Sequence, residues 1–272
     1  MLKKLGIFFG LGFLILFVII PFYWIIVTCF KTNLQILMST NIYIPHPFTM
    51  ENLVYLFQHT RFLIWLKNSF LVATCSTLIA LFAGCLSGFA VSSLEFRGNR
   101  TFSLVIMITY LVPPGLMFLP LYRVFTEFNF TNSVATLMVA YPTFITPFCA
   151  WLMIGFFKSV PKALIEVALI DGANYARTFF TIVMPLVAPG VLASALFCFT
   201  LSWNEFLYAL IFISDETRQT IPVGLSGFLT ADVASWGTLF GASLLATIPV
   251  IILYIYLQKY MIAGLTMGAV KG

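Results

Sequence analysis

Charged residues are scarce in this sequence. Only 8% of its 272 residues are Asp, Glu, Lys or Arg, against about 25% in an ordinary soluble domain. Hydrophobic residues make up 61%, and the mean hydropathy is +1.04. A soluble fold of this length cannot bury so much apolar surface, so a soluble enzyme and a disordered chain are excluded. The apolar residues form long unbroken runs, which also excludes the alternating segments of a membrane β-barrel.

Metal-binding and redox motifs are absent as well. The sequence has five cysteines but no CxxC pair, and no histidine lies near any of them. All five cysteines fall in apolar stretches, where a cysteine packs as a small hydrophobic residue. We therefore expect no metal site. The basic excess of +5 is attributed to loops that set membrane topology and not to nucleic-acid binding.

Six apolar runs are long enough to cross a hydrocarbon core about 30 Å thick, which needs about 20 residues per helix. The first run follows two lysines but is too long for a signal peptide, so it is interpreted as a retained anchor. The predicted spans are Leu5–Phe30, Phe70–Leu94, Phe102–Tyr122, Ser133–Phe157, Ile182–Trp203 and Trp236–Leu257. The fold class is thus predicted to be all-α and integral to the membrane.

None of the six spans contains a charged residue or a histidine, so the chain lacks the intramembrane relay that proton-driven pumps commonly carry. The loop charges set the orientation. With the N-terminus inside, nine basic residues lie in inner segments and five in outer ones. The excess of inner positive charge predicts that both termini are cytoplasmic.

Prolines interrupt several spans. Pro113 and Pro114 are adjacent within the third, Pro142 and Pro147 lie in the fourth, and Pro249 lies in the sixth. Proline removes a backbone donor and bends a helix. Two interpretations stay open: static kinks, or a wall that moves or lines a path, where freed backbone groups face protein or a water-filled cavity.

The inner loop 158–185 has a pattern of its own. Pro161 suits a first helical turn, and Asp171-Gly172 predicts the end of that helix. A second amphipathic run, Ala173–Phe180, leads towards the fifth span. Two short helices joined by a turn are therefore predicted on the inner side, and their apolar faces lie either on lipid or against a partner.

At this loop the sequence resembles the permease subunits of ABC importers. Their EAA loop has EAA, two residues, DGA, eight residues and I-x-L-P. This chain has the same spacing in Glu166-Val167-Ala168-x-x-Asp171-Gly172-Ala173, eight residues, then Ile182-x-Met184-Pro185. Further segments are similar to the sugar-importing branch, in particular to the second permease of maltose-like systems: WLKNSFLVA at 65–73, SWNEFLYAL at 202–210 and GLTMGAVKG at 264–272.

The resemblance implies a type I ABC importer permease (MetI-like) fold with six transmembrane helices in a bacterial inner membrane. It implies an N-terminal helix with an extracytoplasmic segment (1–65), a permease core (66–258) and a cytoplasmic tail (259–272). The implied partners are a second permease forming a heterodimer, two ATPase subunits and an extracytoplasmic substrate-binding protein. The permease itself is expected to catalyse nothing and to bind no cofactor, because ATP and Mg belong to the ATPase.

The sequence agrees with this division of labour, since it has no G-x-x-x-x-G-K-[ST] phosphate loop. Within the EAA-like loop, Gly172 is expected to allow a sharp turn. Glu166 and Asp171 can pair with basic groups or cap backbone donors. Ala168 and Ala173 are expected to keep the docking helix slim enough to enter a cleft.

The translocation path is harder to locate. Tyr110 and Asn204 are candidates because they are polar and lie in or beside spans. The outer segment Asn204–Ser235 is too long for a simple hairpin and is a candidate contact for the binding protein. The alternative function is a secondary transporter or channel, which would usually show an ion site, an inverted repeat or a selectivity motif; none is found.

Overall fold

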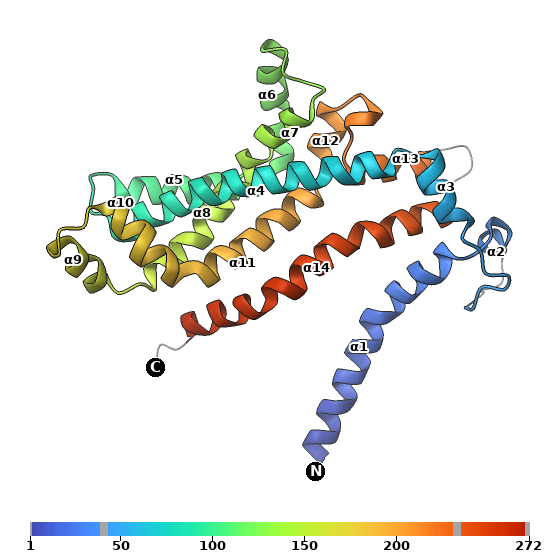
Figure 1. Cartoon of the computed structure of the whole chain (residues 1–272), viewed down its shortest axis with the longest axis horizontal. Coiled ribbons are helices and arrows are strands. Elements are labelled where there is room, and N and C mark those ends of the chain that lie inside the picture. The colour runs from blue at the N-terminus through green and yellow to red at the C-terminus, as the bar shows by residue number, and fades with distance from the viewer. Residues whose placement is uncertain (1, 39–42, 231–234, 270–272) are drawn as a thin grey trace. The chain divides into compact units, whose positions relative to one another are not determined.

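The computed structural model describes residues 2–38, 43–230 and 235–269, with side chains for 6–38, 43–229 and 235–260. The end of the predicted tail, including Lys271, lies outside the described residues, as does 231–234 of the outer segment. All regular elements of the described residues are helical (Figure 1). Their contacts form two compact units: Met1–Leu66 with Ile221–Ile248, and Lys67–Thr220 with Pro249–Gly272.

The first unit holds the long apolar helix α1 (Leu2–Cys29), the short helices α2 (Asn33–Leu37) and α3 (Glu51–His59), α13 (Ile221–Thr230) and the first part of α14 (Trp236–Ala269). Asn52 ties these segments together, because its side-chain amide donates to the carbonyls of Cys29 (2.9 Å) and Lys31 (2.8 Å). Gly241 lets α14 approach α1 and α3 closely, because it has no side chain. A Cβ at this position would lie 3.1 Å from Cys29 Sγ and 3.1 Å from Leu53 Cδ2.

The second unit is built on most of α4 (Phe62–Ser93), together with α5 (Asn99–Leu111), α8 (Pro142–Lys158) and α11 (Met184–Trp203). Glycines permit close helix approach here. A Cβ at Gly84 would meet Cys149 Sγ at 2.6 Å, and one at Gly190 would meet the Phe156 ring at 2.3 Å. Buried cysteines thus serve as small packing residues, as the sequence predicts.

Short helices cap the two ends of this helical group (Figure 1). One end carries α9 (Lys162–Ile170) and α10 (Tyr175–Thr178); the other carries α7 (Val134–Ala140), α12 (Leu207–Phe212) and the 3-10 turn η2 (Glu216–Arg218). The stretch of α4 between residues 68 and 93 measures about 38 Å at 1.5 Å per residue. This length exceeds the hydrocarbon core, so α4 is long enough to reach from one membrane surface to the other.

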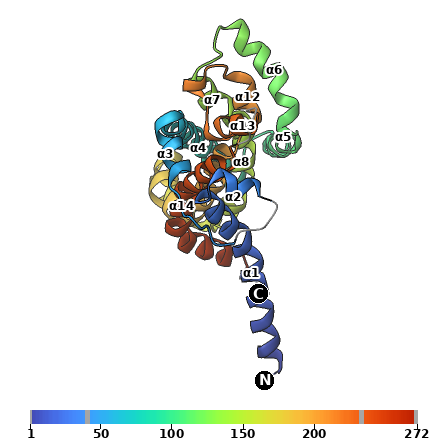
Figure 2. The same cartoon turned by 90° about the vertical axis from the view of Figure 1, so that its right-hand side faces the viewer.

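Within the described residues, five helices are long and apolar enough to span a membrane, and a sixth span is completed if α5 and α6 (Pro114–Glu127) count as one. The interruption that the prolines predict in the third span, Phe102–Tyr122, is a sharp break, because the chain bends by 97° between α5 and α6 (Figure 2). Pro113 and Pro114 interrupt the helical hydrogen bonds there. The α5 helix alone is about 20 Å long, shorter than the hydrocarbon core.

One expectation is corrected. The run Ala173–Phe180 does not form a separate helix: α10 continues through a π-helical turn, η1 (Phe179–Val183), into α11, so Tyr175–Trp203 is one candidate span. The outer segment Asn204–Ser235 contains α12, η2 and α13, and Tyr208, Ala209 and Phe212 within it are buried.

Candidate functional site

The turn after α9 has the geometry that the sequence predicts. Gly172 adopts a left-handed conformation with φ of +85°. The Gly172 N–H donates to Leu169 O at 3.1 Å, and the Ala173 N–H donates to Ala168 O at 3.0 Å. These two bonds form a Schellman motif, which satisfies the last carbonyls of the helix. The next helix, α10, begins after Asn174, whose side chain accepts a hydrogen bond from the Arg177 N–H at 2.8 Å.

Helix α9 has one face turned inward and another exposed. Ile165 and Ala168 are buried, so Ala168 packs within the chain and does not itself offer a slim docking surface. We define the exposed face of α9 by its three large apolar side chains, which are 44%, 55% and 84% exposed: Leu164, Val167 and Ile170. Exposed apolar side chains clustered in this way indicate an interaction surface.

The two acidic residues of the motif are also exposed. Among the described residues, neither the Glu166 nor the Asp171 side chain has a hydrogen-bond or ion-pair partner. Both carboxylates are therefore available to basic groups outside the chain. Pro185 lies at the start of α11, directly after the π-helical turn η1.

Phe179 anchors this segment to the bundle. It follows α10 directly and is buried. Its ring centroid lies 5.0 Å from that of Phe89 on α4 and 6.1 Å from that of Phe157 on α8. An exposed ion pair, Lys162 to Glu95 at 3.3 Å, adds a weaker link between α9 and the α4–α5 connection. Packed aromatic rings thus connect the segment after α9 to two of the spans, α4 and α8.

The two candidates for the translocation path occupy different surroundings. Tyr110 on α5 stacks on Trp151 of α8, with ring centroids 5.7 Å apart and planes 10° from parallel. Asn204 ends α11, is exposed, and donates to Thr200 O at 2.9 Å. No contact joins Tyr110 to Asn204 within the described part of the chain, so the structure does not assemble them into one site.

A half-buried carboxylate beside Asn204 was not singled out from the sequence. Glu205 accepts hydrogen bonds from the N–H groups of Tyr208 (3.0 Å) and Ala209 (3.2 Å) at the start of α12. Burial raises the pKa of the Glu205 carboxyl, and these N–H donors act in the opposite direction. An acidic residue directly before a short apolar run is a helix-start signal and could have identified this cap.

Tyr208 connects α12 to the break in the third span. Its hydroxyl donates to Pro114 O at 3.2 Å, at the first residue of α6. Glu205 and Tyr208 therefore hold the end of α11 and the α5–α6 bend in a fixed relation.

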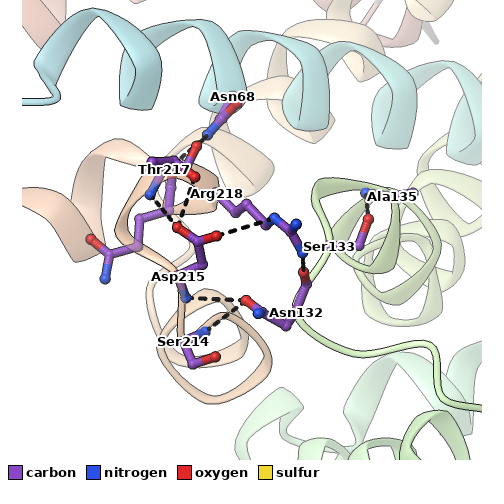
Figure 3. A network of polar contacts seen from close by, with 9 residues as sticks. Asn68, Asn132, Ser133, Ala135, Ser214, Asp215, Thr217 and Arg218 are labelled. Atoms are coloured by element: carbon purple, nitrogen blue, oxygen red, sulfur yellow. Dashed lines mark hydrogen bonds and ion pairs between the residues drawn. The ribbon is translucent and has the colours of Figure 1, made fainter.

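A network of polar contacts fixes the η2 turn (Figure 3). Asn68 on α4 donates to Thr217 O (3.0 Å) and Gln219 O (2.9 Å). The Asn132 side chain accepts from the Ser214 and Asp215 N–H groups, at 3.2 and 3.1 Å. Arg218 pairs with Asp215 at 3.4 Å and donates to Asn132 O. Hydrogen bonds and one ion pair thus hold the η2 turn in place, at the end of the second unit opposite α9. We refer to this turn, Glu216–Arg218, as the η2 knob.

The sequence of this chain matches a known family of transport proteins. Residues 76–266 match the family described as "Binding-protein-dependent transport system inner membrane component". The diacetylchitobiose uptake system permease protein DasC of Streptomyces coelicolor is 32% identical, over 93% of this chain and 92% of its own length. The trehalose/maltose transport system permease protein MalG of Thermococcus litoralis is also 32% identical, over 100% and 98%.

A solved structure with the same fold is a chain from a bacterial ABC transporter involved in the import of the acidic polysaccharide alginate. It superposes with a TM-score of 0.82 at 19% identity and covers 95% of this chain and 97% of that chain. The predicted ABC importer permease fold is therefore confirmed.

Proposed function

Because this chain belongs to the family of binding-protein-dependent transport system inner membrane components, we propose that it is a permease subunit of an ATP-driven ABC importer for a sugar. In this proposal the chain forms a translocation path together with a second permease. The sugar class is inferred from the named substrates of DasC and MalG.

The observation that carries the proposal is the exposed face of α9, followed by the Schellman turn at Gly172. A short helix with large exposed apolar side chains and two unpaired carboxylates needs a protein surface to cover it, since exposed apolar patches of this kind mark interaction sites. An ATPase subunit is the proposed occupant. The EAA-like motif lies on this helix and turn, from Glu166 to Ala173.

The proposed mechanism is mechanical. Closure of two ATPases around ATP and Mg would pull on α9, and Phe179 would pass the displacement to α4 and α8 through its contacts with Phe89 and Phe157. The continuous helical stretch Tyr175–Trp203 would carry it along the fifth span. The permease supplies no catalytic group in this scheme; it converts the movement into access to the path.

The proposed assembly contains a heterodimer of permeases, two ATPases and an extracytoplasmic binding protein, in a bacterial inner membrane. Both termini are placed in the cytoplasm, in line with the nine-to-five split of basic residues. The knob formed by η2 then faces outward, where it is available to the binding protein.

Co-purification tests the proposal. The chain is expressed with its operon neighbours, purified through a tag on the permease, and assayed for a bound ATPase chain. Retention of an ATPase and ATP-dependent sugar uptake in proteoliposomes are the expected results. Uptake that needs no ATP and no ATPase chain would favour the alternative, a secondary transporter or channel.

A further inference from the structure

A cavity lined by polar and aromatic residues lies within the first unit. Its volume is about 290 Å³. Three segments enclose it: α2, α3 and the start of α14. The lining residues are Asn33, Ile36, Leu37, Glu51, Asn52, Tyr55, Ser235, Trp236 and Thr238. Polar groups from three separate segments thus converge on one space, which is the usual composition of a small-molecule site.

Two buried polar side chains form a fixed part of the lining. Both N–H donors of Asn52 are used, on Cys29 O and Lys31 O, so the orientation of the amide is set. The Asn52 Oδ1 atom lies beside Gly237, and a Cβ added to that glycine would be only 2.4 Å from it. Among the described residues, no group donates a hydrogen bond to this oxygen. Thr238 is only 4% exposed, and its hydroxyl likewise has no partner within the described part of the chain.

Neither of these two oxygen atoms is fully buried, so both can be reached by a ligand in the cavity. A ligand that donates to Asn52 Oδ1 and exchanges hydrogen bonds with Thr238 would satisfy both. Hydroxyl groups can act as donor and acceptor at once, and so suit an amide oxygen next to a hydroxyl.

The remaining lining residues suit a ring that carries hydroxyl groups. Tyr55 and Trp236 offer partly exposed aromatic faces, on which the apolar face of a sugar ring can pack. Glu51 and Asn33 add a carboxylate and an amide that accept hydrogen bonds from hydroxyl groups. The volume is near the lower limit of about 300 Å³ for ligand pockets, so it fits one ring and not an oligosaccharide.

Charge restricts the ligand further. Among the described residues, Glu51 is the only charged one that lines the cavity. Lys31 is the residue whose carbonyl accepts a hydrogen bond from Asn52. Its ammonium group lies over the Trp24 ring, 4.1 Å from the ring centroid, and not in the cavity lining. With a carboxylate and no lining cation, the cavity disfavours phosphorylated or acidic sugars.

We propose that this cavity binds one ring of a neutral saccharide. The inference rests on the proposed function, which supplies the sugar class and places α2 and α3 outside the membrane. It adds a ligand site on this permease that is formed by Glu51, Tyr55, Trp236 and the buried pair Asn52 and Thr238. The selectivity for neutral over anionic sugars follows from the lining charge.

The test uses the intact permease–ATPase complex in nanodiscs, without the binding protein. Saturation-transfer NMR measures binding of two neutral probes, trehalose and diacetylchitobiose, and of one anionic probe, glycerol 3-phosphate. At least one neutral probe should bind, and glycerol 3-phosphate should not. Trp236→Leu and Glu51→Gln should each weaken neutral-probe binding roughly tenfold, as expected for loss of a ring contact or a charge-assisted hydrogen bond.

Tyr256→Leu is the matched control, because it removes an exposed aromatic ring from the same helix, α14, outside the cavity. It should bind like the parent complex. If Trp236→Leu does not assemble, Tyr55→Phe and Thr238→Val remove single hydroxyl groups with little change in shape, and each should weaken binding.

Three results would overturn the proposal: no binding of either neutral probe, equal binding in the cavity variants and in Tyr256→Leu, or preference for glycerol 3-phosphate. ATPase retention is measured on the same preparations. A complex that keeps its ATPase but binds no neutral probe contradicts the cavity alone, whereas loss of ATPase from the parent complex contradicts the proposed function.

Discussion

Gly172 shows how one residue can matter to docking without affecting packing. Its φ of +85° lies in the region that L-residues with a Cβ rarely adopt. A Cβ there would meet no atom within 4 Å, so a replacement strains the backbone and clashes with nothing inside the chain. The side chain of a replacement residue would point into open space, where the proposed ATPase partner would lie.

We therefore expect Gly172→Arg to release the ATPase or to uncouple ATP hydrolysis from uptake, while membrane levels stay normal. The backbone strain is about 1–2 kcal/mol, and the added cation would obstruct the interface. Gly172→Asn is the control, because Asn tolerates the left-handed region better than most residues. ATPase retention on purification and uptake are measured; normal values for both in the Arg variant would show that this loop is not the dock.

Glu205 gives a second expectation at this scale. Glu205→Ala leaves the N–H groups of Tyr208 and Ala209 without their acceptor in a buried place, and should destabilise the complex by about 1–3 kcal/mol. Glu205→Gln keeps one acceptor oxygen and should lose less. Thermal unfolding followed by size-exclusion chromatography ranks the two variants. Equal midpoints for Ala, Gln and parent would mean that the cap contributes nothing to stability.

Among the elements, α9 combines a buried face with an exposed apolar one. Val167→Glu places a charge on the exposed face without touching Ile165 or Ala168, which hold the helix to its own chain. A carboxylate buried at a protein interface without a partner is strongly unfavourable. We expect loss of the ATPase with normal insertion.

The matched control for this change is Val124→Glu on α6, a valine of similar exposure (45% against 55%) beside the Arg123–Glu127 pair. It should keep the ATPase. If both variants retain the ATPase equally, the exposed face of α9 is not a docking surface.

The η2 knob limits how contact with the binding protein can be tested. Deleting residues from Asp215–Thr220 would also remove internal hydrogen bonds, because Asn68 and Asn132 both bond to this stretch. Point changes are therefore the sharper probe of the knob.

Asn68→Ala removes the donor to two backbone carbonyls and should lower stability by about 1–3 kcal/mol. Asn204→Ala is the control, since Asn204 is exposed and water can replace its single bond to Thr200. Thermal unfolding of the two variants is compared with the parent. A smaller loss for Asn68→Ala than for Asn204→Ala would contradict the anchoring role.

For the whole molecule, the testable quantity is membrane topology. A reporter that is active only in the cytoplasm should be active when fused after Lys271 and silent when fused near Ser214. The expectation follows from the excess of basic residues in the inner segments. The reverse pattern would invert the roles of the α9 end and the η2 end. Activity at both positions would mean that the chain does not cross the membrane between Ser214 and Lys271, so that α14 would not be a span.

The sequence by itself determined the membrane class, the position of the spans and the turn at Gly172. These features depend on local composition and spacing: a run of about 20 apolar residues has few alternatives to a membrane helix, and Asp-Gly after a helical run favours a left-handed end. The motif from Glu166 to Ala173 was equally visible, because its residues lie within one turn and one short helix.

Only the tertiary structure decided which faces are covered. It placed Ala168 inside and Val167 outside, joined Phe179 to Phe89 and Phe157, and broke the third span at Pro113 by 97°. It also brought Asn52, Tyr55 and Trp236 around one cavity. In a chain that is apolar throughout its spans, hydropathy does not distinguish a buried face from an exposed one, so contacts between residues far apart in sequence supply that information.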